Sequence, residues 1–331
     1  MIKFRTEVEL PEFSKKMGYR HQSLMIGSCF AENIGIWLQN RCLPVMVNPF
    51  GILYNPVSIA NSLEYLITGK IFTLQDLFYA NGVYSSFSHH SRFSDSDPES
   101  MLRHINAQTT ETLNTLKNSS HLFITFGTSW VFQHKINGEI VSNCHKLPAA
   151  TFNRYRLSVI QITDYWIPII EQLRQLNPDL HLVFTVSPIR HLKDGAHENQ
   201  LSKSTLFLGI DALSAHFGNE LISYFPSFEL LHDELRDYRF YATDMTHLSE
   251  IAIDFIREKF VTVILDQEAK TIVNELDKIL PGLNHRPKNS EEAGYISFIG
   301  HQIEKMNQLQ SKYHFVDFSR VIKKFNKKTT D

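Results

Sequence analysis

The sequence predicts an α/β fold in which a parallel β-sheet is covered by helices on both faces. Short apolar runs rich in β-forming residues alternate with helical patterns along the chain, as they do in βαβ units. Small polar residues follow several of these runs, and sites in open α/β sheets gather at the carboxyl ends of strands. The predicted strands are Ser23–Ile26, Pro44–Val47, His121–Phe126 and Leu180–Val186.

Helical patterns follow or separate the predicted strands. The clearest is a long amphipathic segment that ends at Asn177, because the residue before a proline disfavours helix. The predicted helices are Glu32–Asn40, Val57–Ile67, Glu99–Leu116, Ser158–Leu176, residues 197–217 and Leu248–Ile256.

Two insertions are expected in this fold, near residues 70–100 and near residues 130–145. The first is rich in Ser, Asp, His and aromatic side chains, a composition typical of a surface loop. In the second, Asn137 and Gly138 separate two apolar runs and predict a two-residue β-hairpin. We expect that hairpin to decorate the main sheet.

We expect residues 1–280 to form one α/β domain and residues 281–331 to form a C-terminal helical extension. A turn at Pro281 marks the boundary, and one helix is predicted over Glu291–Leu309. Residues 320–328 are basic, which usually indicates a solvated and frayed tail rather than a site for anions or nucleic acid.

The composition is that of an ordinary globular protein. Of 331 residues, 43% are hydrophobic and 21% are charged, and the net charge is −2. These values exclude a disordered chain and a generally basic nucleic-acid binder. The sequence shows no secretory signal and no run of the ~18 apolar residues that a membrane span needs, so we expect a cytoplasmic protein. Three cysteines without a CxxC pair indicate reduced thiols rather than disulfides or a zinc site.

Residues 24–35 run from an apolar strand through a small polar turn into a helix, and Ser28 lies in that turn. A serine at this position has its hydroxyl beside the free amides of a helix N-terminus, which acyl transfer requires. Ser28 is therefore a candidate nucleophile. The alternative is that Ser28 only caps the helix, because serine is a favoured N-cap residue.

A candidate base lies near the end of the predicted α/β domain. Asp244 and His247 are three positions apart at the start of a helix, so the carboxylate can orient Nδ1 and leave Nε2 free. A serine hydroxyl needs such a base, because it is a weak nucleophile by itself. The alternative is that Asp244 caps the helix and His247 is a surface side chain.

Two other strand ends offer candidate oxyanion donors. Gly51 follows the second strand and could present its amide closely to a tetrahedral intermediate, because glycine has no side chain. Ser129 follows the third strand and could offer an amide or a hydroxyl. For residues 127–129, a tight turn into the hairpin is the alternative.

Residues 27–31 read Gly-Ser-Cys-Phe-Ala, and this stretch resembles the motif that names the GSCFA family of bacterial proteins. That family is similar to the SGNH (GDSL-like) hydrolases. Further segments resemble the same family and extend the resemblance over about residues 20–260. They are residues 48–51, 143–146, 186–191, 199–203, 236–241 and 244–247.

The SGNH resemblance implies a three-layer flavodoxin-like α/β fold, a serine nucleophile in a first Gly-Asp-Ser block, and a late Asp-x-x-His. Here the first block reads Gly27-Ser28-Cys29, so either Ser28 or Cys29 could occupy the nucleophile position. We favour Ser28, because a free cysteine beside a helix start is often just a small buried apolar residue.

In the wider superfamily, a glycine amide and an asparagine side chain complete the oxyanion hole. Gly51 fits the first role, but Ser129 stands where the asparagine is expected. Losing one such donor typically costs about 3 kcal/mol of transition-state stabilisation. Asn48, His145 or Asn199 could compensate.

Several polar residues on loops are expected to face the substrate. They are Asn48, His145, Arg190, His191 and Asn199. Arg190 could hold a carboxylate or a phosphate by a bidentate contact. The alternative is a structural pair of Arg190 with Asp194 or Asp211. No metal site is expected, because no recognisable ligand spacing occurs.

Together these residues predict a serine hydrolase that acts on ester bonds through Ser28, His247 and Asp244, with an acyl-enzyme and no cofactor. An acceptor hydroxyl in place of water would make it an acyltransferase. A Cys29 thiol enzyme and a non-catalytic ligand-binding module with a degraded oxyanion hole stay open. The expected partner is a small-molecule ester, with no nucleic acid and no membrane span, and the oligomeric state is left open.

Overall fold

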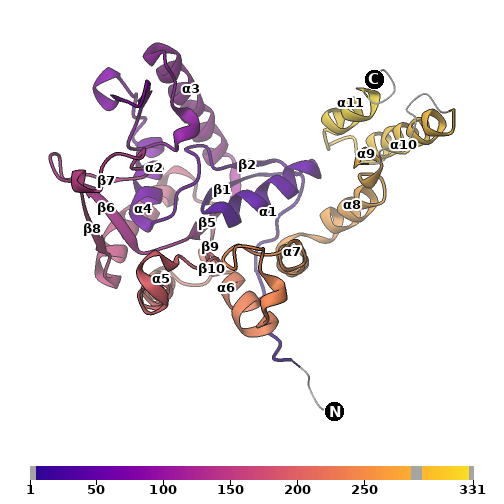
Figure 1. The fold of residues 1–331 in the computed structure, drawn as a ribbon. Helices are drawn as coiled ribbons and strands as arrows, with labels where there is room; N and C mark the ends of the chain where they lie inside the picture. The colour runs from indigo at the N-terminus through magenta and orange to yellow at the C-terminus, as the bar shows by residue number, and fades with distance from the viewer. Residues whose placement is uncertain (1–4, 285–292, 328–331) are drawn as a thin grey trace.

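The computed structural model describes residues 5–284 and 293–327. Its centre is a sheet of five parallel strands in the order β10-β9-β5-β1-β2 (Figure 1). This is the flavodoxin-like order that the resemblance implies. The strands are β1 (Gln22–Gly27), β2 (Val45–Val47), β5 (Ser119–Phe126), β9 (His181–Val186) and β10 (Ile222–Tyr224).

The four predicted strands are confirmed, and β10 is an additional strand. It has only three residues, which is too few to show a strand period in the sequence. Every residue of β9 is buried, because helices cover both faces of the sheet, and its sequence is therefore a nearly continuous apolar run.

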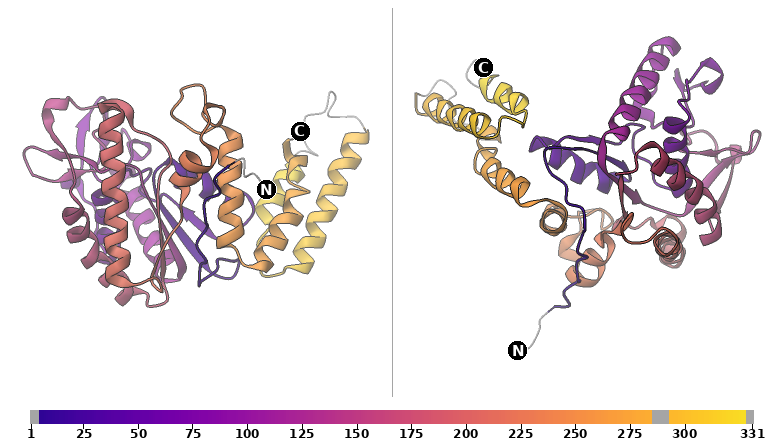
Figure 2. Two further views of the ribbon diagram at one scale, coloured as in Figure 1. Left: turned by 90° about the horizontal axis from the view of Figure 1, so that it is seen from below. Right: turned by 180° about the vertical axis from the view of Figure 1, so that it is seen from behind.

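Helices cover both faces of the sheet, as predicted (Figures 1 and 2). Successive residues of β1 point to opposite faces, so Met25 joins one apolar cluster while Leu24 and Ile26 join the other. The first cluster includes α1 (Cys29–Asn40) and α7 (Glu250–Ile264). The second includes α2 (Pro56–Ile67), α3 (Pro98–Lys117), α4 (Val159–Leu176) and α5 (Gly195–Phe217).

Two small sheets lie outside the main sheet. The predicted hairpin is confirmed, but its connection is residues 135–138 rather than Asn137 and Gly138 alone, because His134 pairs with Glu139. The expectation that the hairpin decorates the main sheet is wrong. Its first strand pairs instead with a third strand, so the three form a separate sheet. The strands of the small sheets are β3 (Phe78–Ala80), β4 (Val83–Ser85), β6 (Trp130–His134), β7 (Ile140–Val141) and β8 (Phe152–Arg156).

The C-terminal helices contribute to the apolar cluster that contains α1 and α7. The predicted helix over Glu291–Leu309 corresponds to α10, except that residues 291–292 lie outside the described residues. Val321 and Phe325 of α11 are buried, so the expectation of a frayed tail is wrong for this helix. These helices are α8 (Gln267–Asp277), α9 (Pro281–Asn284), α10 (Ala293–Lys312) and α11 (Ser319–Lys327), and α10 and α11 stand at one side of the layers (Figure 2).

Short helical turns complete the described chain. One of them is a π-helical turn, η5 (Leu230–Leu235), a rare form that often occurs at functional sites. No described helix combines the length and the apolar character needed to cross a membrane. The remaining turns are η1 (Leu74–Asp76), η2 (Ser91–Phe93), η3 (Ala149–Thr151), η4 (Leu192–Asp194), α6 (Ser227–Glu229) and η6 (Tyr238–Phe240).

Gly27 ends β1 at a point where the backbone of β5 comes very close. Its φ angle is +145°, in the region that favours glycine. A Cβ atom at this position would overlap the carbonyl oxygen of Thr125. The amide of Ser28 donates to that same oxygen at 3.2 Å, so the close approach determines where the chain leaves the sheet.

We predict that Gly27→Ala lowers the free energy of unfolding by about 3 kcal/mol or more, because the opposing atoms are backbone and cannot rotate away. Gly300→Ala is a matched control. Gly300 lies inside α10 with open space around it, so alanine there should be neutral or stabilise by up to about 1 kcal/mol. Urea unfolding measures both variants, and wild-type stability of Gly27→Ala would contradict the close approach.

Candidate active site

The candidate site lies at the carboxyl ends of β1 and β5. This is the topological switch point of the sheet, because β2 is added on one side of β1 and β5, β9 and β10 follow on the other. The segment of residues 48–54 crosses both strand ends. Gly27 N donates to Asn48 Oδ1 at 2.9 Å, and Leu53 N donates to Gly27 O at 3.0 Å. At β5, Gly127 N donates to the carbonyl oxygen of Tyr54 at 2.7 Å. These bonds fix the turn that contains Ser28.

Ser28 and Cys29 begin α1 in this turn. Ser28 is the N-cap residue, and its Oγ accepts a 3.4 Å hydrogen bond from Phe30 N. The exposed fraction of Ser28 is only 1%, whereas Cys29 is half-buried. The geometry is compatible with both interpretations of Ser28, as a helix cap and as a nucleophile, and the thiol beside it is the more accessible group.

The pKa of the Cys29 thiol is determined mainly by burial. Burial raises the pKa of this thiol, and it outweighs the opposite effects of hydrogen bonds from the amides of Cys29 and Phe30 and of the Lys203 charge. The thiol is therefore protonated at neutral pH and would need a base to react.

The structure brings His247 and Asp244 together. His247 Nδ1 and Asp244 Oδ2 are 2.5 Å apart, and Asp244 Oδ1 accepts the amides of Thr246 and His247 at 2.9 Å each. The hydrogen bond to the imidazole, with those to the amides, lowers the pKa of Asp244 to about 2. His247 is exposed, and within the described chain its Nε2 makes no hydrogen bond to Ser28 or to another group. The complete triad stays a prediction.

Gly51 and Ser129, the predicted oxyanion donors, have partners inside the protein. Gly51 N donates to Asn48 O at 2.8 Å. Ser129 is fully buried, and its amide and hydroxyl approach Ser202 Oγ at 2.9 and 3.1 Å. In this conformation neither group is free to donate to an oxyanion, and the two roles stay predictions.

Asn48 differs from the other residues that could compensate for the missing asparagine. Its Oδ1 is held by Gly27 N, while its Nδ2 is buried and has no hydrogen-bond partner among the described residues. In contrast, His145 Nε2 lies 2.8 Å from Ser86 O, which ties His145 to the insertion of residues 70–100. Asn48 is therefore the amide best placed beside the turn of Ser28.

His191 and Asn199 lie together beside the end of β5. Asn199 Oδ1 accepts the amide of His191 at 2.9 Å. A Cβ atom added to Gly127 would lie 3.4 Å from His191 Nε2, a buried nitrogen that has no hydrogen-bond partner among the described residues. Burial lowers the pKa of His191 to about 4, so its ring is neutral at pH 7.

Sequence reasoning missed Lys203 as a candidate site residue. Its Nζ donates to Gly127 O and Ser187 O at 2.7 Å each, and so joins the carboxyl ends of β5 and β9. The side chain is completely buried, and burial lowers its pKa to about 7. The available signal was a lysine at helical spacing with Leu206 and Ile210 on the apolar face of α5.

Arg190 follows β9 at the same edge of the sheet, and it forms no ion pair with Asp194. Asp194 pairs instead with Arg154 through two hydrogen bonds of 2.5 and 2.6 Å. Arg190 has no carboxylate partner within the part of the chain that the structure describes, so the alternative that Arg190 pairs with Asp194 or Asp211 is not supported.

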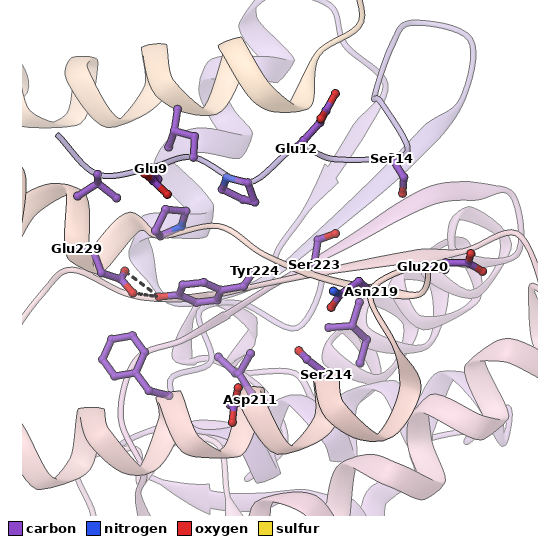
Figure 3. Close-up of a pocket in the computed structure, with 17 residues that line it drawn as sticks. Glu9, Glu12, Ser14, Asp211, Ser214, Asn219, Glu220, Ser223, Tyr224 and Glu229 are labelled. Carbon is purple, nitrogen blue, oxygen red and sulfur yellow. Dashed lines mark hydrogen bonds between the residues drawn. The ribbon is translucent and has the colours of Figure 1, made fainter.

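A cavity of about 970 Å³ lies elsewhere, between the N-terminal segment, β10 and α5 (Figure 3). None of the predicted site residues lines it. Tyr224 donates to Glu229 inside it, and its other charged side chains are also carboxylates. Its lining contains no His, Cys, Lys or Arg. Over residues 5–284 and 293–327, no group of three or more His, Cys, Asp or Glu side chains is arranged to hold a metal ion.

Comparisons with known proteins identify the family of this chain. The model of the GSCFA family matches residues 22–260, and the model described as GSCFA domain protein, C-terminal domain, matches residues 276–331. A solved acetyl xylan esterase from the rumen bacterium Butyrivibrio proteoclasticus is similar at 11% identity, with a TM-score of 0.37. That match covers 76% of this chain and only 64% of the esterase chain. A search of curated proteins found no match.

We predict that wild-type protein gains stability relative to Lys203→Met as the pH rises. Above pH 7 the folded protein releases the Lys203 proton, whereas the unfolded chain retains it up to about pH 10.4. The unfolded state then binds more protons, so rising pH favours folding, by about 2 kcal/mol between pH 7 and pH 9. Urea unfolding at both pH values measures the difference, and parallel pH profiles of the two proteins would contradict a buried amine with a lowered pKa.

Proposed function

We propose that this chain, which belongs to the GSCFA family, is a hydrolase that acts on ester bonds through an acyl-enzyme. The observation that supports this most strongly is the hydrogen bond between His247 and Asp244, which orients the imidazole and leaves its Nε2 free. A nucleophile pair at the start of α1 and an unpartnered amide beside it supply the other groups that acyl transfer needs.

In the proposed reaction, Ser28 Oγ attacks the ester carbonyl while His247 Nε2 takes the hydroxyl proton. The imidazolium, stabilised by Asp244, then gives that proton to the leaving alcohol as the ester C–O bond breaks. Water attacks the acyl-serine by the reverse sequence and releases the acid. An acceptor hydroxyl in place of water would give acyl transfer. No cofactor enters these steps.

Asn48 is the proposed side-chain donor to the oxyanion. Its Nδ2 is buried without a partner, and its Oδ1 accepts from Gly27, the residue before the nucleophile. An unsatisfied buried donor costs about 1–3 kcal/mol, which a developing oxyanion would repay only in the transition state. The first amides of α1 are the proposed backbone donors.

A Cys29 thiol enzyme is the second candidate. It is favoured by one observation, namely that Cys29 is half-buried while Ser28 is only 1% exposed. In this version His247 deprotonates the thiol, which then forms a thioester with the acyl group.

Hydrolysis of 4-nitrophenyl acetate by single variants tests the proposal. We expect Ser28→Ala and His247→Ala each to lower kcat by about 10³-fold or more, because the two side chains act as one unit. Cys29→Ala should retain activity, and Cys42→Ala is the control for loss of another half-buried thiol. If Cys29→Ala loses the hydrolytic activity and Ser28→Ala keeps it, the nucleophile is the Cys29 thiol. No turnover by folded wild-type protein would contradict both versions.

Asn48→Asp tests the proposed donor role of Asn48 Nδ2 separately from the structural role of Oδ1. The carboxylate keeps an acceptor for Gly27 N and tolerates the left-handed backbone at this position, where φ is +45°, but it removes the N–H donor. We expect kcat to fall by about 10²-fold or more, with a much smaller effect on KM. Thermal unfolding checks that the variant is folded, and a wild-type kcat would show that Asn48 donates to no oxyanion.

A further inference from the structure

Arg190 presents an unpaired positive charge at the edge of the sheet where the proposed reaction occurs. It lies four residues after the end of β9 and is half-buried. Within the described chain it forms no ion pair, and its Nε is buried without a hydrogen-bond partner. A partly desolvated charge of this kind is costly unless a ligand or a counter-charge satisfies it.

The His232 imidazole lies beside one arm of the guanidinium. His232 Nε2 lies 2.9 Å from Pro188 O and must donate to it, so Nδ1 is the acceptor nitrogen. That Nδ1 lies 3.2 Å from the Tyr241 hydroxyl and 3.5 Å from Arg190 Nη2. Burial lowers the pKa of His232 to about 4, which keeps the ring neutral and able to accept. The imidazole orients the arginine without neutralising its charge.

No carboxylate of the described chain forms an ion pair with Arg190. Lys203 acts electrostatically on both Arg190 and Cys29, and its amine contacts only carbonyl oxygens. Asp233 acts on His232 but is exposed and forms no ion pair with Arg190. Arg190 therefore keeps a positive charge that a bound anion would balance.

We infer that the substrate carries an anionic group, a carboxylate or a phosphate, that binds Arg190 while the ester lies at Ser28 or Cys29. This inference rests on the proposed function for the position of the ester. The planar guanidinium suits either anion, because two parallel N–H donors match two anion oxygens. The carboxylate-lined cavity beside β10 would repel such a substrate, so the anion is directed to the sheet edge.

Direct binding tests the anion site without turnover. Isothermal titration calorimetry of the full chain with succinate and with inorganic phosphate should show one site, and Arg190→Gln should weaken it at least tenfold. Arg103→Gln, an exposed arginine on α3, is the matched control and should bind as wild type does. Arg190→Lys, which keeps the charge but loses the fork, should lie between them. Binding of succinate alone indicates a carboxylate, and binding of phosphate alone indicates a phosphoryl group.

A second measurement separates this inference from the proposed function. Wild-type protein should hydrolyse 4-nitrophenyl hemisuccinate with at least tenfold higher kcat/KM than neutral 4-nitrophenyl butyrate, and Arg190→Gln should lower that ratio to about one. An unchanged ratio, or anion binding that Arg190→Gln leaves intact, overturns the anion site while ester turnover itself stands. Anion binding that depends on Arg190 without any ester turnover overturns the proposed function and leaves the anion site. Absence of binding of both anions to wild-type protein overturns the anion site.

Discussion

The close approach of Gly27 to the backbone of β5 is the constraint on which the candidate site depends. Because no side chain separates the two strands here, Ser28 N reaches Thr125 O and the chain turns directly into α1. The amide of Gly27 donates to Asn48 Oδ1, and its carbonyl oxygen accepts from Leu53 N. Gly27 thereby determines both the position of Ser28 and Cys29 and the path of the loop that crosses the strand ends.

Several buried nitrogen atoms without partners lie at this edge of the sheet. Asn48 Nδ2, His191 Nε2 and Arg190 Nε each lack a hydrogen bond within the described chain, and each such group costs about 1–3 kcal/mol. Lys203 adds a buried amine with no carboxylate beside it. In the reaction proposed above, a developing oxyanion would satisfy Asn48 Nδ2 and a substrate anion would satisfy Arg190.

The main sheet and its helices were predictable because strands buried on both faces are apolar runs and because helices show a 3.6-residue period. The pair of Asp244 and His247 was predictable because it is local in sequence. The partner of Ser129 was not, since Ser202 is distant in sequence. The burial of α11 was also missed, because basic residues dominate its sequence and only Val321 and Phe325 are buried apolar side chains.

Labelling with a fluorophosphonate probe, followed by mass mapping of the modified residue, tests the central claim most directly. We expect an adduct on Ser28 that is lost in His247→Ala, because the hydroxyl reacts only when the imidazole removes its proton. An adduct that survives in His247→Ala, or no adduct on Ser28 in folded wild-type protein, would contradict a serine activated by His247.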